Sequence, residues 1–220
     1  GVDRKKGTLS KYHYMRLRLQ EFIQAKYKTS DLAFGQLTEQ FIYDFQDYVT
    51  DEVGNSIDTA KHYLAHLKKA CRMAFKEGHT DKQYFAHFKL PVRKCNTPKA
   101  LSKEQFEAVR DMEIEEKRPQ HRFARDLFLF ACYTGVPYGD AVTITRENLV
   151  RDKNGDLWLK YKRVKNRMQA AVKLLPEALE LIAKYHDDNR KTLFPHIETH
   201  ALMAHIRGIG LRLGIKGLRY

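Results

Sequence analysis

Residues 125–144 decide how the sequence is organised, and they read RDLFLFACYTGVPYGDAVTI. Apolar residues occupy most faces of a predicted helix from Gln120 to Tyr133, which is typical of a helix at the centre of a domain. Gly135 is placed to end this helix, and Pro137 opens a short helix after it. The stretch therefore predicts a central helix, a glycine stop and a short second helix.

After this stretch the hydrophobic pattern changes from helical spacing to alternation. Residues 152–156 (DKNGD) are typical of a turn, and residues 157–161 alternate like a strand. Residues 170–175 form a second predicted strand, after a turn around Lys165 and Asn166. The sequence thus predicts a small antiparallel sheet.

Three or four amphipathic helices are expected in the first ninety residues. The clearest has one apolar stripe from Ala60 to Phe75, with Ser56 or Asp58 at its start and Gly78 as its C-terminal cap. The first helix has Thr8 or Ser10 available as N-cap. Helical spacing also marks residues 12–23, 41–49, 178–185 and about 199–213.

Residues 91–100 (PVRKCNTPKA) contain two prolines and three basic residues without a hydrophobic period, which is typical of an extended linker. A new helix start follows, because Ser102 and Gln105 can form a capping box and Leu101 and Phe106 occupy the positions of a hydrophobic staple. The predicted fold is mainly α with a small antiparallel β-sheet, divided into residues 1–90, 91–100 and 101–220.

The chain is strongly basic, with 40 Lys and Arg against 27 Asp and Glu and a formal net charge of +13. Hydrophobic residues make up 43% of it, so a packed core is expected rather than a disordered basic tail. Both predicted domains share the excess, with 17 basic and 11 acidic residues before residue 98 and 23 and 16 after it. This charge indicates an anionic partner.

Several classes of protein are disfavoured by composition. The longest apolar run, Leu127–Val136, is about half of the roughly 20 residues that cross a bilayer, and no signal peptide is recognised. The three widely spaced cysteines, Cys71, Cys95 and Cys132, argue against a disulfide framework and a structural zinc site. A protein of a reducing compartment, the cytoplasm, is expected.

The face of the third predicted helix opposite its apolar stripe is basic, and it comprises Lys61, Lys68, Lys69, Arg72 and Lys76. Such a face can follow the phosphates of a nucleic acid, but a solvated helix surface explains it equally well. Two basic domains on a linker favour a clamp that grips double-stranded DNA.

Three segments, in this order, resemble the tyrosine recombinases of the phage-integrase family, and more narrowly the integrases of conjugative transposons and similar mobile elements. They are residues 125–144, residues 158–176 (WLKYKRVKNRMQAAVKLLP) and residues 192–220 (TLFPHIETHALMAHIRGIGLRLGIKGLRY). The resemblance implies a helical, SAM-like core-binding domain over residues 1–90 and a mixed α/β, partial catalytic domain over residues 101–220.

The implied activity is site-specific DNA recombination without cofactors. In that family a tyrosine attacks a phosphodiester, a 3′-phosphotyrosyl link conserves the bond, and four protomers act around two duplexes. The first residue is Gly1 and the last is Tyr220, so we expect a fragment, monomeric without DNA and inactive alone.

The resemblance also assigns catalytic positions, with one departure. Thr134, Gly135 and the acidic Asp140 match the family, but Pro137 stands where the family has a catalytic arginine. Arg125 is our candidate for the missing cation, because an arginine on an apolar helix face must meet an anion. A DNA phosphate and an internal carboxylate are equally good candidates for that anion.

The hairpin turn provides the second implied catalytic group. Lys165 occupies the place of the family's hairpin lysine, which can protonate the leaving 5′ oxygen as a general acid. An ordinary charged turn is the alternative. The residues that we predict to bind DNA are Thr59, Lys61, Lys68, Arg72, Arg163 and Arg167.

The remaining groups of the family, an H-x-x-R pair and the nucleophilic tyrosine, are not recognised in these 220 residues. Tyr220 is expected to be structural, because in the family's order it precedes the H-x-x-R pair. His196, His200 and His205 lack an acidic or cysteine ligand at suitable spacing, so we predict no metal site.

Two other functions stay open. A non-catalytic DNA-binding homologue or regulator is favoured by Pro137, and an RNA-binding protein is consistent with the basic charge. No aromatic RNA-binding strand is recognised in the sequence, and competition between duplex DNA and duplex RNA separates these possibilities.

Overall fold

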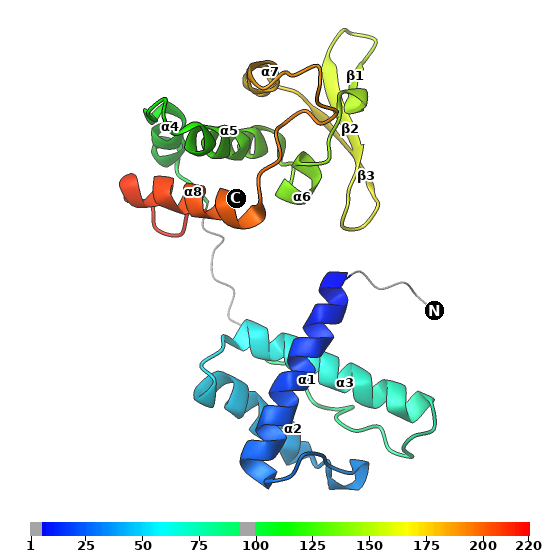
Figure 1. The fold of residues 1–220 in the computed structure, drawn as a ribbon. Coiled ribbons are helices and arrows are strands. Elements are labelled where there is room, and N and C mark those ends of the chain that lie inside the picture. Colours follow the sequence, from blue (N-terminus) through cyan, green and yellow to red (C-terminus); the bar gives the residue numbers. More distant parts are fainter. Residues whose placement is uncertain (1–5, 93–99) are drawn as a thin grey trace. The chain divides into compact units, whose positions relative to one another are not determined.

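The structure is a computed structural model, and it describes residues 6–92 and 100–220 (Figure 1). It divides into two compact units, Gly1–Pro98 and Lys99–Tyr220, each with its own hydrophobic core. The predicted linker, residues 91–100, lies mostly outside the described residues. None of the helices in the described ranges is long and apolar enough to cross a membrane.

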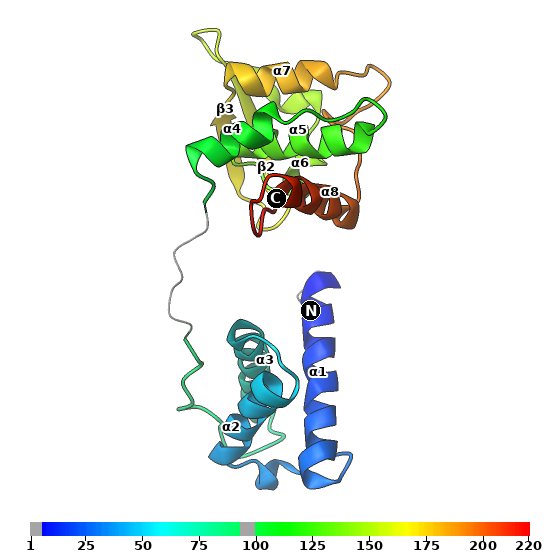
Figure 2. The ribbon, with the colours of Figure 1, turned by 90° about the vertical axis from the view of Figure 1, so that its left-hand side faces the viewer.

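The first unit packs α1 (Lys6–Tyr27), α2 (Glu39–Asp47) and α3 (Ile57–Lys76) around an aromatic core (Figure 2). Two short helical turns, Phe34–Gln36 and Tyr48–Glu52, lie before and after α2. The largest fully buried side chains include Phe22, Phe41, Phe45, Ile42 and Leu64, which are the apolar positions that helical spacing predicted.

Helix caps in the first unit are partly those expected from the sequence. The Ser56 hydroxyl accepts a hydrogen bond from Thr59 N, and Gly78 ends the helix with a φ of 78°. The prediction for the first helix is wrong, because Thr8 and Ser10 lie inside α1 rather than before it.

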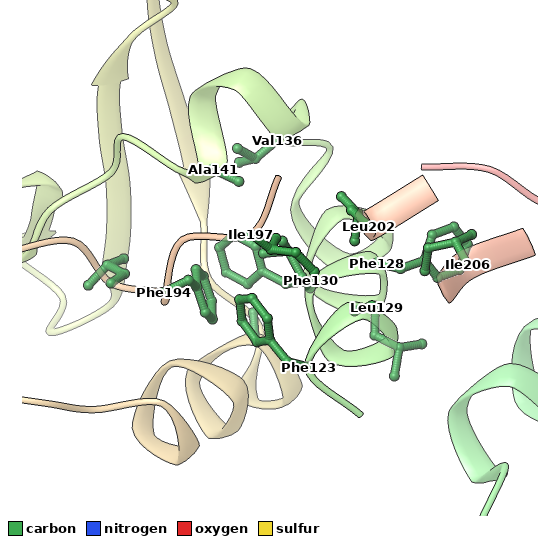
Figure 3. Packing of buried hydrophobic residues seen from close by; sticks show 14 of the residues in the cluster. Phe123, Phe128, Leu129, Phe130, Val136, Ala141, Phe194, Ile197, Leu202 and Ile206 are labelled. Atoms are coloured by element: carbon green, nitrogen blue, oxygen red, sulfur yellow. The ribbon is translucent and has the colours of Figure 1, made fainter. Parts of the chain in front are cut away.

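The second unit is built around α5 (Pro119–Thr134), as the sequence predicted. Helices α4 (Lys103–Asp111), α7 (Pro176–Lys184) and α8 (Thr199–Arg212) pack against α5. Figure 3 shows Phe123 and Phe130 of α5 pointing toward Phe194, and Phe128 of α5 toward Ile206 of α8. Gly135, with a φ of 67°, ends α5 and leads to the short helix α6 (Tyr138–Ala141).

The sheet of the second unit has the order β1–β2–β3 and is antiparallel throughout. Its strands are β1 (Leu149–Arg151), β2 (Leu157–Lys162) and β3 (Gln169–Lys173). The mainly helical fold with a small antiparallel sheet is therefore confirmed. The sequence did not predict β1, because a three-residue strand behind a short 3₁₀ turn is too brief to show a period.

The start of α4 also agrees with the prediction. The Ser102 hydroxyl accepts a hydrogen bond from Gln105 N at 3.2 Å, and the Gln105 side chain accepts one from Ser102 N at 3.0 Å. This reciprocal pair is the expected capping box. Leu101 and Phe106, the predicted staple residues, are both partly buried against the core of the second unit.

Candidate functional site

The junction between α5 and α6 holds the position where the resemblance expects an arginine. Thr134 donates a hydrogen bond to Phe130 O at 2.6 Å and accepts one from Val136 N at 3.3 Å, which fixes the chain before it turns. Pro137 is exposed at the start of α6, with a φ of −64° and a ψ of 151°. The position is thus at the surface, in a backbone conformation open to any residue.

Asp140 connects α6 to the turn between β2 and β3. Its side chain is 5% exposed, and Oδ1 accepts a hydrogen bond from Val164 N at 2.8 Å. Its Oδ2 lies 3.5 Å from Nε of Arg163. Figure 1 shows α6 beside the sheet on this side of the unit. The acidic residue therefore holds the backbone next to Lys165, the predicted general acid.

The turn itself is well ordered by its own hydrogen bonds. Arg163 N donates to Met168 O and Arg167 N to Arg163 O, both at 2.9 Å. Arg167 has a φ of 62°, and its side chain is exposed, as is that of Lys165. Arg163 is partly exposed, at 42%. The turn thus carries three cations, Arg163, Lys165 and Arg167, and Arg163 contacts the buried Asp140 carboxylate.

Arg125 is held by an internal carboxylate instead of facing the turn. Its Nε lies 2.9 Å from Asp126 Oδ1, and Nη1 donates to Met112 O at 2.6 Å. The Asp126 side chain is 2% exposed, and its Oδ2 also accepts from Lys184 Nζ at 2.6 Å and the Tyr185 hydroxyl at 2.8 Å. These contacts match the internal ion pair, one of the two alternatives for Arg125.

Asp126 was not singled out from the sequence, although its position offered a signal. It is a carboxylate in an otherwise apolar stretch of α5, and such a group needs partners when buried. Burial raises the pKa of Tyr185, and its hydrogen bond to Asp126 raises it further. The tyrosine is therefore a neutral donor to the carboxylate.

A largely apolar pocket of about 330 Å³ lies behind Pro137, between α5, α6 and α8. Tyr220 lines it, and the Tyr220 hydroxyl donates to Val136 O at 3.3 Å. Burial raises the pKa of this hydroxyl, with smaller contributions from Cys132 and Tyr138. The contacts agree with a structural role for Tyr220.

The predicted DNA-binding face of α3 is formed by residues with different surroundings. Lys68 is partly buried, and its Nζ donates to Phe88 O and, at 3.4 Å, to Ala86 O. Arg72 is exposed, and Lys61 is partly buried. Lys68 therefore holds the segment after α3, which the sequence analysis did not foresee.

The hydroxyl of Thr59, another predicted contact, lies 3.1 Å from the Ser56 hydroxyl at the start of α3. Thr59 also borders a small groove between α1 and α3, which Lys11, Tyr14, His62, Tyr63 and His66 complete. Sequence analysis missed Lys11, His62 and His66, although His62 and His66 stand one turn apart on the basic helix.

The histidines considered as metal ligands are not gathered. His196 Nε2 lies 3.0 Å from Glu198 Oε1 on an exposed surface, and the rings of His205 and His121 are tilted relative to each other with centroids 4.2 Å apart. Within residues 6–92 and 100–220, no group of three or more potential metal ligands is found.

A family model matches most of the first unit. Residues 2–90 match the family model of the phage integrase SAM-like domain. Among curated proteins, none matches the chain. Residues 2–90 of the first unit are therefore similar to the phage integrase SAM-like domain.

Solved structures extend the comparison to the whole chain. The λ integrase fragment 75–356, in a dimer bound to a COC′ core site, is 16% identical with a TM-score of 0.73, and the match covers 100% of this chain and 75% of that one. XerH site-specific recombinase bound to difH is 17% identical with a TM-score of 0.68, over 95% of this chain and 62% of that one.

A longer λ integrase chain, also in a dimer bound to a COC′ core site, is 17% identical with a TM-score of 0.69, and the match covers 99% of this chain. The chain spans about three fifths of the length of XerH and of this integrase, 62% and 60%. The chain has the fold of these λ integrase and XerH structures, in agreement with the resemblance predicted from its sequence.

Proposed function

We propose that the chain is the DNA-gripping part of a tyrosine recombinase that carries out site-specific recombination or integration. The observation that supports this most is the pairing of a phage integrase SAM-like domain with a second unit whose buried Asp140 holds the turn that carries Lys165. The similar λ integrase and XerH structures contain DNA, and the chain carries a net charge of +13. Double-stranded DNA is the proposed partner, and the cytoplasm is the proposed location.

In the proposed reaction, cations around the scissile phosphate stabilise the pentacoordinate phosphorane while a tyrosine attacks. Lys165 is the proposed general acid, because an exposed ammonium on a turn can reach the leaving 5′ oxygen. Tyr220 is not the proposed nucleophile, since its hydroxyl is buried and bonded to Val136 O. A tetramer on two duplexes is the proposed assembly of the whole protein.

The salt dependence of DNA binding tests this function. If about six phosphates are contacted, log affinity falls with log salt at a slope near −5. Lys61→Ala with Arg72→Ala reduces the slope by about 2, because two phosphate contacts are lost. Lys103→Ala with Lys117→Ala, outside the proposed surface, is the matched control. A flat salt response, or preference for duplex RNA over duplex DNA, contradicts the proposal.

A non-catalytic DNA-binding homologue or regulator is the second candidate. Two observations favour it: Pro137 replaces the expected arginine, and Arg125 is held by Asp126 and Met112 O. The whole protein, incubated with a nicked duplex that traps cleavage, separates the two candidates. A covalent protein–DNA complex on a denaturing gel supports the recombinase, whereas salt-dependent binding without that complex supports the regulator.

A further inference from the structure

The contact between Arg163 and Asp140 places a second cation next to α6, where Pro137 leaves the expected arginine out. Arg163 follows the end of β2, yet its Nε lies 3.5 Å from Oδ2 of Asp140. Asp140 N in turn donates to Pro137 O at 2.9 Å, so the carboxylate is one helical turn from the proline. The guanidinium and the start of α6 therefore belong to one site.

Asp140 contacts Nε of this guanidinium, and the arginine side chain stays partly exposed to solvent. The carboxylate is 5% exposed and has a second bond, from Val164 N, that fixes its orientation. Among the described residues, 6–92 and 100–220, no hydrogen bond is found for the terminal nitrogens of Arg163, whose contact with Asp140 runs through Nε at 3.5 Å. Since the side chain is 42% exposed, these two nitrogens can meet an anion from solvent.

The other cations near the site fit this role less well. Two nitrogens of the Arg125 guanidinium are bonded within the protein, Nε to Asp126 Oδ1 and Nη1 to Met112 O. Arg167 sits at the exposed, left-handed position of the turn, and no carboxylate among the described residues orients it. Orientation matters because a preorganised donor stabilises developing charge without the cost of being ordered during the reaction.

We propose that Arg163 binds the scissile phosphate in place of the arginine missing at Pro137, and that Asp140 is its positioning residue. This inference rests on the proposed function. The two terminal nitrogens donate to non-bridging oxygens of the phosphate, and Arg163 keeps its proton throughout. Arg163 on the neighbouring β2–β3 hairpin thus supplies the positive charge that Pro137 does not provide at the start of α6.

Rescue by a relocated arginine tests the proposal on the 220-residue chain. Arg163→Ala weakens binding to a duplex oligonucleotide by about tenfold, the loss expected for one charge-assisted hydrogen-bonded contact. Adding Pro137→Arg restores most of this affinity, because the new side chain starts from α6 and reaches the same phosphate. The matched control is Arg167→Ala, whose loss of affinity Pro137→Arg does not repair.

A second variant guards against a folding defect. Arg163→Gln keeps a donor for Asp140 but removes the charge, and it should lose as much affinity as Arg163→Ala with an unchanged melting temperature. The proposal is overturned if Pro137→Arg repairs Arg163→Ala no better than Arg167→Ala, or if Arg163→Gln binds like the unaltered chain. Salt-dependent binding by the unaltered chain is measured in parallel, so that failure of the proposed function is recognised separately.

Discussion

Asp126 and Asp140 are both buried aspartates of the second unit, yet their surroundings differ. Asp126 contacts Arg125, Lys184 and the Tyr185 hydroxyl, and the last two connect α5 to the end of α7. Asp140 meets a backbone N–H and an arginine that is still 42% exposed. Lys184 is itself 43% exposed, so the two sites differ in the number and closeness of their side-chain partners. Asp126 has three such partners within 2.9 Å, which we call the closed set, and Asp140 has one at 3.5 Å, which we call the open set.

The largest change in the free energy of unfolding is expected when Asp126, the centre of the closed set, is replaced. Asp126→Ala leaves Arg125, which is 14% exposed, without its carboxylate, and it should lower the free energy of unfolding by about 3 kcal/mol. Urea unfolding followed by the fluorescence of Trp158 measures this, because the chain has one tryptophan and it lies in β2. Asp111→Ala, which breaks an exposed pair with Arg110, is the matched control and should leave the free energy of unfolding nearly unchanged, because solvent screens the pair.

Replacing Arg125 tests whether this residue serves the stability of the fold or the reaction on DNA. If Arg125 belongs to the closed set, Arg125→Ala lowers stability and leaves the affinity for DNA unchanged. Cleavage by the whole protein that falls strongly while stability is retained would instead return Arg125 to the catalytic role expected from the sequence.

An intermediate change in the free energy of unfolding is expected when Asp140, the centre of the open set, is replaced. Asp140→Ala removes the acceptor of Val164 N and should lower the free energy of unfolding by about 2 kcal/mol. Asp140→Asn keeps an acceptor oxygen for Val164 N but loses the charge that faces Arg163, so its cost should be smaller. Hydrogen exchange at the Val164 amide separates the two variants: it should become faster in Asp140→Ala than in Asp140→Asn. Equal exchange in both would show that Asp140 does not hold the turn.

Two lysines of α3 in the first unit, Lys68 and Lys61, differ in a similar way, and the effects expected from replacing them are smaller. Lys68 donates to the carbonyls of Ala86 and Phe88, whereas Lys61 has no such contact among the described residues. Lys68→Met should lower the stability of the first unit by about 1 kcal/mol, seen as faster hydrogen exchange in residues 84–90. Lys61→Met should instead reduce the salt slope of DNA binding by about 0.9 without that change in exchange. The reverse pattern would contradict this division of roles.

Sequence reasoning found the features that depend on near neighbours along the chain. The capping box of Ser102 and Gln105, the stop at Gly135 and the hairpin turn with Lys165 involve contacts a few residues apart. It missed contacts between distant residues, because a periodic pattern shows which face is buried and not which partner arrives there. Such cases are the hydrogen bond from Lys184 to Asp126, 58 residues apart, and the one from Lys68 to Phe88 O, 20 residues apart.

The smallest effect concerns His66, a titrating group in the groove between α1 and α3. Its ring stacks on Tyr12 at 4.3 Å, and its Nε2 is buried without a hydrogen-bond partner among the described residues. Burial lowers the pKa of His66, and His62, Lys11 and Lys69 lower it further.

The unfolded chain therefore takes up a proton on His66 at a higher pH than the folded chain does. The stability that the neutral ring provides is complete above the unfolded pKa of about 6.5, and it is lost as the pH falls from that value through the lower pKa of the folded chain. Because the ring is partly exposed and solvent screens it, the loss should be about 0.5 kcal/mol. His66→Phe, which keeps an aromatic ring against Tyr12 but cannot titrate, should show a smaller fall in the stability of the first unit between pH 7.5 and pH 5.5, measured by thermal unfolding. An identical fall in stability in the unaltered chain and in His66→Phe would contradict this prediction. Groups other than His66 would then control the acid sensitivity of the first unit.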